Sequence, residues 1–361
     1  MTITGHNRFF VKQLLEWNEY QNKREMPWKG EKDPYKIWLS EIILQQTRVD
    51  QGLEYYNRFI NNFPDVRQLA LAPETMVFKL WEGLGYYTRC KNVIATARFI
   101  SQQLNGQFPN QYDDILQLKG VGPYTAAAIA SFAFNLPYAV VDGNVFRVLA
   151  RYFGIATATD SVQGKQQFTL LANELLDKKS PGIYNQALMD FGAVICKPQL
   201  PVCATCVLNT KCIAYNNGLI NQLPVKEKKI KKTTRWFYYL VVEYNGKLYV
   251  RKRGAKDIWE NLYEFILIEE DKPVQLEKIR ELKKVKEIFR SVNFEVTQIS
   301  PLYKQLLTHQ TIQGQFVRVK TDKKLELSEY ELFTNVEIDS LPFPKFITAY
   351  LKDKNVSLNL F

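Results

Sequence analysis

The chain contains the stretch Leu118-Lys119-Gly120-Val121-Gly122-Pro123-Tyr124-Thr125, and this stretch decides the fold of its amino-terminal half. It lies between a short helical run and an Ala-rich helix expected over Thr125–Phe134. Two glycines allow a close backbone approach, and proline suits the first turn of a helix. The stretch therefore predicts a helix-hairpin-helix whose amides, at the start of the second helix, can hold a phosphate oxygen. An ordinary Gly-Val-Gly turn is the alternative.

The size and charge of the whole chain fit a multidomain protein with a negatively charged partner. Its 361 residues predict two or three domains with a sizeable buried core. Apolar residues make up 46% and charged residues 24%, which excludes a disordered, collagenous or coiled-coil chain. The formal net charge of +11 favours nucleic acid or anionic lipid as a partner, and charge alone does not choose between them.

The sequence predicts neither export nor membrane insertion. Met1–Tyr20 carries Arg8, Lys12 and Glu16 among its apolar residues, so it lacks the uninterrupted apolar segment of a secretory signal. The longest apolar stretch, Ala126–Val141, is interrupted by polar residues and proline and is too short to span a bilayer. We therefore expect a cytoplasmic protein in a reducing compartment, with no membrane contact.

The periodicity of apolar residues changes along the chain. From Asn7 to about Gly218 they recur at helical spacing, which predicts an all-helical half. The basic run Val225–Arg235 then predicts a linker, either a plain one or one that lies on DNA phosphates. An α+β domain follows, opened by a hairpin around Asn245-Gly246. Its strands are expected over Trp236–Tyr244, Lys247–Lys252, Glu264–Ile268, Val292–Ile299 and Gln315–Val319, and its helices over Val274–Ile288 and Lys345–Leu351.

Four cysteines near the end of the helical half predict a metal centre. The spacing Cys196-x6-Cys203-x2-Cys206-x5-Cys212 places four thiols within one short segment of a chain that is not exported. Four thiolates suit a tetrahedral zinc ion or a 4Fe-4S cluster. The uneven spacing favours the cluster without deciding between the two.

Two carboxylates stand in contrasting settings. Glu41 lies on the apolar stripe of a helix with Ile37 and Leu44, where burial should raise its pKa and keep it protonated near neutral pH. Asp142 precedes another helix, where capping amides should lower its pKa and keep it ionised. A protonated acid with an ionised partner is the pair that breaks glycosidic bonds. The alternatives are a surface glutamate and a simple helix cap.

Five motifs in this order resemble the adenine DNA glycosylases of the MutY type, within the endonuclease III superfamily, over nearly the whole chain. They are Glu41-Ile-Ile-Leu-Gln-Gln-Thr47, Trp81-Glu-Gly-Leu-Gly-Tyr-Tyr87, the hairpin, Val141-Asp-Gly-Asn144 and the four-cysteine segment. The resemblance implies a six-helix barrel domain over residues 29–137 and a 4Fe-4S cluster domain built from residues 1–28 and 138–222. A basic linker over 223–235 and a Nudix-like domain over 236–361 would follow.

The implied reaction is hydrolytic removal of adenine mispaired with 8-oxoguanine or guanine in double-stranded DNA, by a monomer acting in base excision repair. Glu41 would protonate the flipped adenine at N7, Asp142 would stabilise the oxocarbenium ion, and Asn144 and Tyr124 would orient the site. The resemblance places Arg24, Trp28 and Gln186 around the adenine, and Thr308 and His309 at the 8-oxoguanine. It gives contacts with DNA to Leu44, Gln46 and Tyr86. The residues themselves add phosphate contacts at Gly120, Val121 and Gly122 of the hairpin and at Lys197, in the loop between Cys196 and Cys203.

Three departures from related patterns refine these expectations. Superfamily members that also cleave the strand carry a Schiff-base lysine where this chain has Tyr124, so the chain is expected to be monofunctional. Leu307-Thr308-His309 replaces the family's Phe-Ser-His, and His309 alone also fits an ordinary surface histidine. No acidic Nudix box is present, so nucleotide hydrolysis is not expected. The alternatives are a glycosylase/lyase for oxidised pyrimidines and a non-catalytic metalloprotein that binds DNA mispairs.

Overall fold

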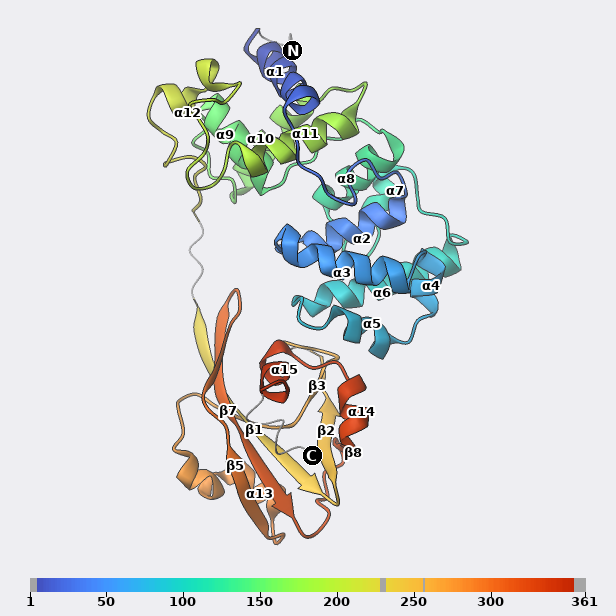
Figure 1. The fold of residues 1–361 in the computed structure, drawn as a ribbon, viewed down its shortest axis with the longest axis vertical. Coiled ribbons are helices and arrows are strands. Elements are labelled where there is room, and N and C mark those ends of the chain that lie inside the picture. Colours follow the sequence, from blue (N-terminus) through green and yellow to red (C-terminus); the bar gives the residue numbers. More distant parts are fainter. Residues whose placement is uncertain (1–4, 228–231, 256, 354–361) are drawn as a thin grey trace. The chain divides into compact units, whose positions relative to one another are not determined.

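The structure, a computed structural model, describes residues 5–227, 232–255 and 257–353. These residues form two compact units, one built from Met1–Leu71 with Asn92–Lys228 and the other from Ala72–Lys91 with Lys229–Phe361 (Figure 1). Besides Ala72–Lys91, the second unit therefore consists of the part of the chain that follows the first stretch of the predicted basic linker. Residues 228–231 of that linker lie outside the described residues.

The first unit is helical throughout its described part, as the apolar periodicity predicts. No helix among the described residues of the chain is long and apolar enough to cross a bilayer. The helices of this unit are α1 (Gly5–Tyr20), α2 (Pro34–Leu44), α3 (Val49–Asn62), α4 (Val66–Leu71), α6 (Tyr87–Gln103, which begins in the second unit), α7 (Tyr112–Leu116), α8 (Pro123–Phe134), α9 (Gly143–Phe153), α10 (Val162–Leu175), α11 (Pro181–Val194) and α12 (Ile213–Asn216), with a 3-10 turn at Asn209–Lys211.

The predicted helix-hairpin-helix is confirmed between α7 and α8. Val121 donates its amide to Leu118 at 3.0 Å, which closes the turn. Gly120 has a φ of +81°, and a Cβ there would lie 2.7 Å from the Asn92 side chain, so both backbone and space require glycine. Gly122 caps α8 and Pro123 occupies its first position, so the helix begins two residues before the expected Thr125.

The amino-terminal helix packs against helices from the far end of this unit. Phe10, Leu14 and Trp17 of α1 are buried in one apolar cluster with residues of α9, α10 and α11. The ring of Trp17 meets that of Phe191 edge to face at 5.0 Å. This burial fixes α9 and α11, the two helices that carry the functional residues described below.

The second unit is built around a mixed sheet of eight strands. Its centre is β1 (Thr233–Tyr244), which pairs in parallel with β7 (Gln310–Thr321) and antiparallel with β2 (Lys247–Lys252) and β4 (Ile266–Glu270). Asn245 and Gly246, with φ of 49° and 74°, form the predicted turn between β1 and β2. The remaining strands, all at the flanks of these four, are β3 (Tyr263–Glu264), β5 (Phe294–Ile299), β6 (Tyr303–Leu306) and β8 (Glu331–Phe333).

Several boundaries in this unit differ from those expected. β1 begins at Thr233 because Thr233–Arg235, assigned to the linker, already pair with Gln310–Ile312 of β7. The strand expected over Glu264–Ile268 is two strands, interrupted at Phe265. The helix expected over Val274–Ile288 is a 3-10 turn followed by a helix. The helical elements are a 3-10 turn at Leu276–Glu281, α13 (Lys283–Phe289), α14 (Asn335–Ser340), which the sequence pattern did not show, and α15 (Lys345–Leu351), as predicted.

Residues Ala72–Lys91, expected in the barrel, group instead with the second unit. They include α5 (Glu74–Trp81) and the turn after it. The Glu82 carboxylate accepts from the amide of Phe343 at 2.8 Å, and Lys79 donates to the carbonyl of Leu341 at 2.9 Å. Lys91 forms an ion pair with Glu260 at 2.5 Å. These polar contacts join the segment to the Nudix-like part of the chain, and the boundary between barrel and cluster domain stays a prediction.

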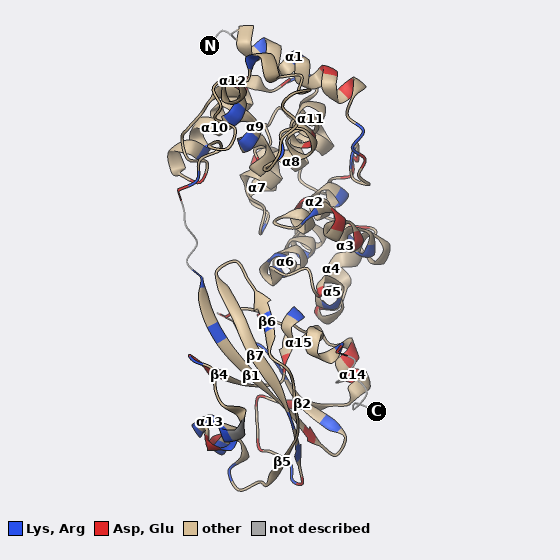
Figure 2. Ribbon diagram, turned by 60° about the vertical axis from the view of Figure 1, so that its left-hand side comes forward, with Lys and Arg blue, Asp and Glu red and all other residues tan. Residues whose placement is uncertain are grey.

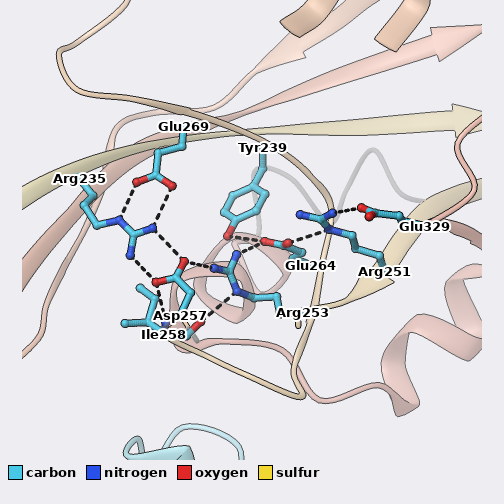
Figure 3. A network of polar contacts seen from close by, with 9 residues as sticks. All are labelled: Arg235, Tyr239, Arg251, Arg253, Asp257, Ile258, Glu264, Glu269 and Glu329. Atoms are coloured by element: carbon cyan, nitrogen blue, oxygen red, sulfur yellow. Dashed lines mark hydrogen bonds and ion pairs between the residues drawn. The ribbon is translucent and has the colours of Figure 1, made fainter. Parts of the chain in front are cut away.

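A chain of ion pairs fixes the segment that follows β2 (Figure 3). The carboxylate of Glu264, which is 1% exposed, pairs with Arg253 and with Arg251, the latter at 3.0 Å. Asp257 pairs with Arg253 and with Arg235, both at 2.7 Å. Because the buried charges have opposite partners, the segment keeps a defined conformation with few glycines.

Basic and acidic side chains are spread over helices of both units rather than gathered on one element (Figure 2). The net charge of +11 therefore favours an anionic partner without locating its binding surface.

Candidate active site

A cavity of about 740 Å³ lies within the first unit, between α2, α8, α9, α11 and the segment after α1. It brings together half of the predicted site residues. Those that line it are Arg24, Trp28, Glu41, Leu44, Gln46, Gly122, Tyr124, Asp142, Asn144 and Gln186. The cavity is large enough for a purine base and part of its sugar.

Glu41 faces this cavity from a helix with a well-defined start. Asp33 caps α2 by accepting from the amide of Tyr35, and Pro34 takes the first helical position. Glu41 is 6% exposed, and burial raises its pKa to about 7, as predicted, helped by the nearby Asp142 charge. The Tyr124 hydroxyl donates to Oε2 of Glu41 at 2.6 Å. The proton of the neutral acid is therefore carried on Oε1.

Asp142 caps α9 as expected, but the predicted direction of its pKa shift is wrong. Its Oδ1 accepts from the amide of Val145 and its Oδ2 from the side chain of Asn144, both at 2.7 Å. These bonds favour the charged form, yet burial outweighs them and raises the pKa of Asp142. The sequence pattern showed the cap and did not show how deeply the cap is buried.

Arg147, which sequence reasoning missed, ties Asp142 to the cysteine segment. Its guanidinium donates to Oδ1 of Asn144 at 2.8 Å and to the carbonyl of Cys196 at 2.7 Å. Asn144 thereby turns its amide nitrogen toward Asp142. The position of Arg147 three residues after Asn144 on α9 is the only sequence signal for this link.

The predicted adenine-pocket residues converge on a carboxylate that sequence reasoning also missed. Asp190 of α11 is fully buried and accepts from Arg24 at 2.8 Å and from Gln186 at 2.9 Å. Lys29 lies 3.1 Å from its other oxygen. Trp28 is buried, with its ring edge to face against Tyr56 at 5.3 Å. The segment after α1 is thus fixed to α11 along one wall of the cavity.

Comparisons with known proteins agree with this geometry. Residues 39–173 match the HhH-GPD superfamily of base excision DNA repair proteins, and residues 237–353 match the NUDIX domain. The adenine DNA glycosylase of Buchnera aphidicola subsp. Baizongia pistaciae is 39% identical over 71% of this chain and 73% of its own length. The chain belongs to the adenine DNA glycosylase family. The mouse adenine DNA glycosylase is also 39% identical, over 60% of this chain and 44% of its own length.

Solved structures show the same helical fold. A thermostable thymine-DNA glycosylase is 30% identical with a TM-score of 0.55, and the match covers 59% of this chain and 97% of that one. Endonuclease III in a non-covalent complex with DNA is 20% identical with a TM-score of 0.51, covering 59% of this chain and 96% of that one. The family fold therefore extends over the helical unit.

The residues that the adenine DNA glycosylase motifs assign to DNA contact lie at the edge of the cavity or outside it. Gln46, just past the end of α2, is exposed with a φ of 56°, and Leu44 is half-buried beside it. Gly120 and Val121 lie in the hairpin, away from the cavity lining. The amide of Val121 is already bonded to Leu118, whereas those of Gly120 and Gly122 have no acceptor within the described residues.

The two predicted 8-oxoguanine residues lie in the second unit together with Tyr86. The Tyr86 hydroxyl and the Thr308 hydroxyl are 2.8 Å apart. Thr308 and the exposed His309 occupy the turn between β6 and β7, which is closed by the amide of Leu307 donating to Gln310 at 2.8 Å. The structure therefore places Tyr86, which is expected to contact DNA, within hydrogen-bond distance of Thr308, which is expected to contact the 8-oxoguanine. The two residues lie more than 200 positions apart in the sequence.

The four clustered cysteines line a second, small cavity of about 30 Å³ in the first unit. Among the described residues no three His, Cys, Asp or Glu side chains converge to hold a single metal ion. Arg151 contacts the Sγ of Cys196 at 3.5 Å and donates to the carbonyl of Lys197 at 2.7 Å. Lys197 itself is exposed on the loop that Arg151 holds in place.

Proposed function

We propose that the protein removes adenine mispaired with 8-oxoguanine or guanine in double-stranded DNA, by hydrolysing its N-glycosidic bond as a monomer. The observation that carries the proposal is one cavity lined both by the buried Glu41, with a pKa of about 7, and by the cap residue Asp142. Membership in the adenine DNA glycosylase family supports adenine as the base removed.

The proposed chemistry uses the two carboxyl groups in succession. The adenine is extruded from the stack into the cavity, because its glycosidic bond is inaccessible in the duplex. Oε1 of Glu41 donates its proton to N7, so the base leaves as neutral adenine with the bonding electron pair. Asp142, held by Val145 and Asn144, stabilises the positive charge left on the sugar as an anion. Water then adds to the anomeric carbon and gives up its proton to the Glu41 carboxylate, which yields the abasic site and restores the neutral acid.

Tyr124 supports the proposal that the enzyme does not cleave the strand. A phenol forms no imine with the sugar, and Tyr124 already donates its hydroxyl to Glu41. Lys119 does not line the cavity. Gln46, Leu44 and Tyr86 are proposed to enter the duplex and offset the cost of extruding the base.

A single-turnover assay tests the proposed function directly. The duplex carries one adenine opposite 8-oxoguanine, and the products are analysed with and without hot alkali. We expect strand breakage only after alkali treatment, which indicates base removal without lyase chemistry. Breakage without alkali would support the glycosylase/lyase alternative, and tight binding without any alkali-labile product would support the non-catalytic alternative.

The cysteine segment is proposed to hold a 4Fe-4S cluster through Cys196, Cys203, Cys206 and Cys212. The four thiols line one small cavity, and the family motif, with its uneven cysteine spacing, favours the cluster over one zinc ion. The cluster would fix the loop that presents Lys197 to a DNA phosphate.

Replacing Cys206 by Ser is expected to lower bound iron and the brown absorbance of the purified protein to a small fraction of the native values, because an alcohol is a poor iron ligand. Iron analysis and the visible spectrum measure both quantities. The matched control is Cys90→Ala, since Cys90 is buried apart from the segment and should leave about four irons per chain. Equal iron in the Cys206→Ser protein would contradict the assignment.

Thr308 is proposed to read the base opposite adenine together with Tyr86. Thr308→Val removes the hydroxyl contact while keeping the shape, so the ratio of excision rates for 8-oxoguanine over guanine partners should fall by about 2- to 10-fold, the value of one hydrogen bond. Tyr86→Phe should lower the ratio similarly, and the double variant should lower it no further. Fully additive losses would show that the two hydroxyls act independently.

A further inference from the structure

The cavity wall around Asp190 has a hydrogen-bonding pattern that constrains what the pocket offers to a base. Asp190 has no exposed surface, and its Oδ1 accepts from Arg24 at 2.8 Å and from the side-chain nitrogen of Gln186 at 2.9 Å. Its Oδ2 accepts from Asn22 at 2.9 Å and lies 3.1 Å from Lys29. Two cations and two amides thus share one buried carboxylate.

This arrangement determines the orientation of the Gln186 amide. A carboxylate paired with two cations offers acceptors only, so Gln186 must turn its NH₂ group toward Asp190. Its carbonyl oxygen is then the group left for the cavity, which Gln186 lines. Within the described residues this oxygen has no donor.

We propose that Asp190 is a positioning residue for base specificity: by fixing the Gln186 carbonyl toward the cavity, it selects a purine with a 6-amino group. The 6-amino group of adenine donates to such a carbonyl, whereas the 6-oxo group of hypoxanthine or guanine would place two acceptors together. A pocket that leaves a polar group unpaired rejects the mismatched base. The inference rests on the proposed function, because it concerns the same cavity.

Arg24 and Lys29 make this wall costly to rearrange. Lys29 also donates to the carbonyl of Arg24 at 2.8 Å, and the amide of Arg24 donates to Asn22 at 3.1 Å. The segment from Asn22 to Lys29 therefore folds around Asp190, and rotating this buried carboxylate away would leave it without its two half-buried cations. The Gln186 carbonyl is consequently preorganised before any base arrives.

The test compares adenine with hypoxanthine, each opposite 8-oxoguanine, in single-turnover assays with the full chain. Hypoxanthine keeps N7 and the glycosidic bond and changes only the 6-substituent and the N1 proton. Asp190→Ala frees the Gln186 amide to rotate, so the adenine/hypoxanthine rate ratio should fall at least about 10-fold. Glu25→Gln removes a negative charge from the same segment at an exposed position, and its ratio should match the native one.

A rescue variant distinguishes a positioning role of Asp190 from a purely structural role of the same residue. Gln186→Glu in the Asp190→Ala background returns the negative charge beside Arg24 and Lys29 and offers an acceptor in either rotation. The adenine/hypoxanthine ratio should then return to within about 3-fold of the native ratio, which a merely structural defect would not allow. An unchanged ratio in Asp190→Ala, or no recovery in the double variant, overturns the proposal.

Two further outcomes are informative. If Asp190→Ala does not fold, Gln186→Leu tests the carbonyl with Asp190 intact; its ratio should fall about 10-fold or more, and an unchanged ratio overturns the proposal. Native protein that removes neither base would instead overturn the proposed function. Native protein that removes both bases at equal rates would leave that function standing and overturn the role of Asp190.

Discussion

Replacing Glu41 by Gln is expected to lower the single-turnover rate of adenine excision by about 10²- to 10⁴-fold, the range for a lost general acid. Gln keeps the shape of the side chain and its contact with Tyr124 but has no proton to donate to N7. DNA affinity should stay within about 2-fold of the native value, since a neutral group replaces the neutral acid. Excision at the native rate would remove Glu41 as the acid.

The pH dependence of the native enzyme gives a second readout of the same group. Because the protonated form is required and the pKa of Glu41 is about 7, the excision rate should fall as the pH rises through 7. The residual activity of Glu41→Gln should lose this limb of the profile. A native profile that stays flat from pH 6 to 8.5 would contradict the assignment.

The raised pKa of Glu41 also predicts that ionising this buried carboxyl group lowers the free energy of unfolding of the protein. The folded protein binds this proton more tightly than the unfolded chain, where the pKa is 4.5, so stability decreases as the pH rises from 4.5 through 7. At pH 8 the cost reaches about 3 kcal/mol, and Glu41→Gln should recover much of it. Thermal unfolding of the two proteins at pH 5 and pH 8 measures this difference, which should nearly vanish at pH 5.

Replacing Asp142 by Asn is expected to reduce excision by about 10²- to 10³-fold, as expected when one preorganised electrostatic group is lost. The Asn carbonyl can still cap α9 by accepting from the amide of Val145, so the helix is retained. What is lost is the negative charge that faces the cationic sugar. The loss should appear equally with 8-oxoguanine and with guanine opposite the adenine.

A matched variant separates charge from capping. Ser161→Ala removes the comparable side-chain cap of α10, in which the Ser161 hydroxyl accepts from the amide of Gly164 at 2.9 Å away from the cavity. It should cost about 1 kcal/mol of stability and leave the excision rate unchanged. If Asp142→Asn lost stability in the same way but kept the native excision rate, Asp142 would be a helix cap and nothing more.

The local patterns in the sequence were sufficient for the hairpin, for the turn between β1 and β2 and for the burial of Glu41. Glycine and proline positions located the hairpin, the Asn245-Gly246 pair located the turn between β1 and β2, and apolar periodicity located Glu41 on a buried helical face. Each of these features depends on neighbours within a few positions along the chain. These three features can therefore be predicted from the local sequence alone.

Features that depend on distant contacts were missed or wrong. The pKa of Asp142 is raised because the surrounding helices bury it, and no capping pattern reveals that burial. Thr233–Arg235 form part of a strand because β7, far along the chain, pairs with them. Ala72–Lys91 group with the second unit because Glu82 and Lys79 bond to residues near position 342.

The sequence by itself determined the helical and α+β halves, the hairpin and the cysteine segment, since periodicity, turn residues and spacing are local properties. The tertiary structure alone decided that Arg24 and Lys29 join the local Gln186–Asp190 pair, and that Arg147 links Asn144 to Cys196. Buried polar groups must find partners wherever the fold brings them, and the partners of Asp190 lie up to 168 positions away from it.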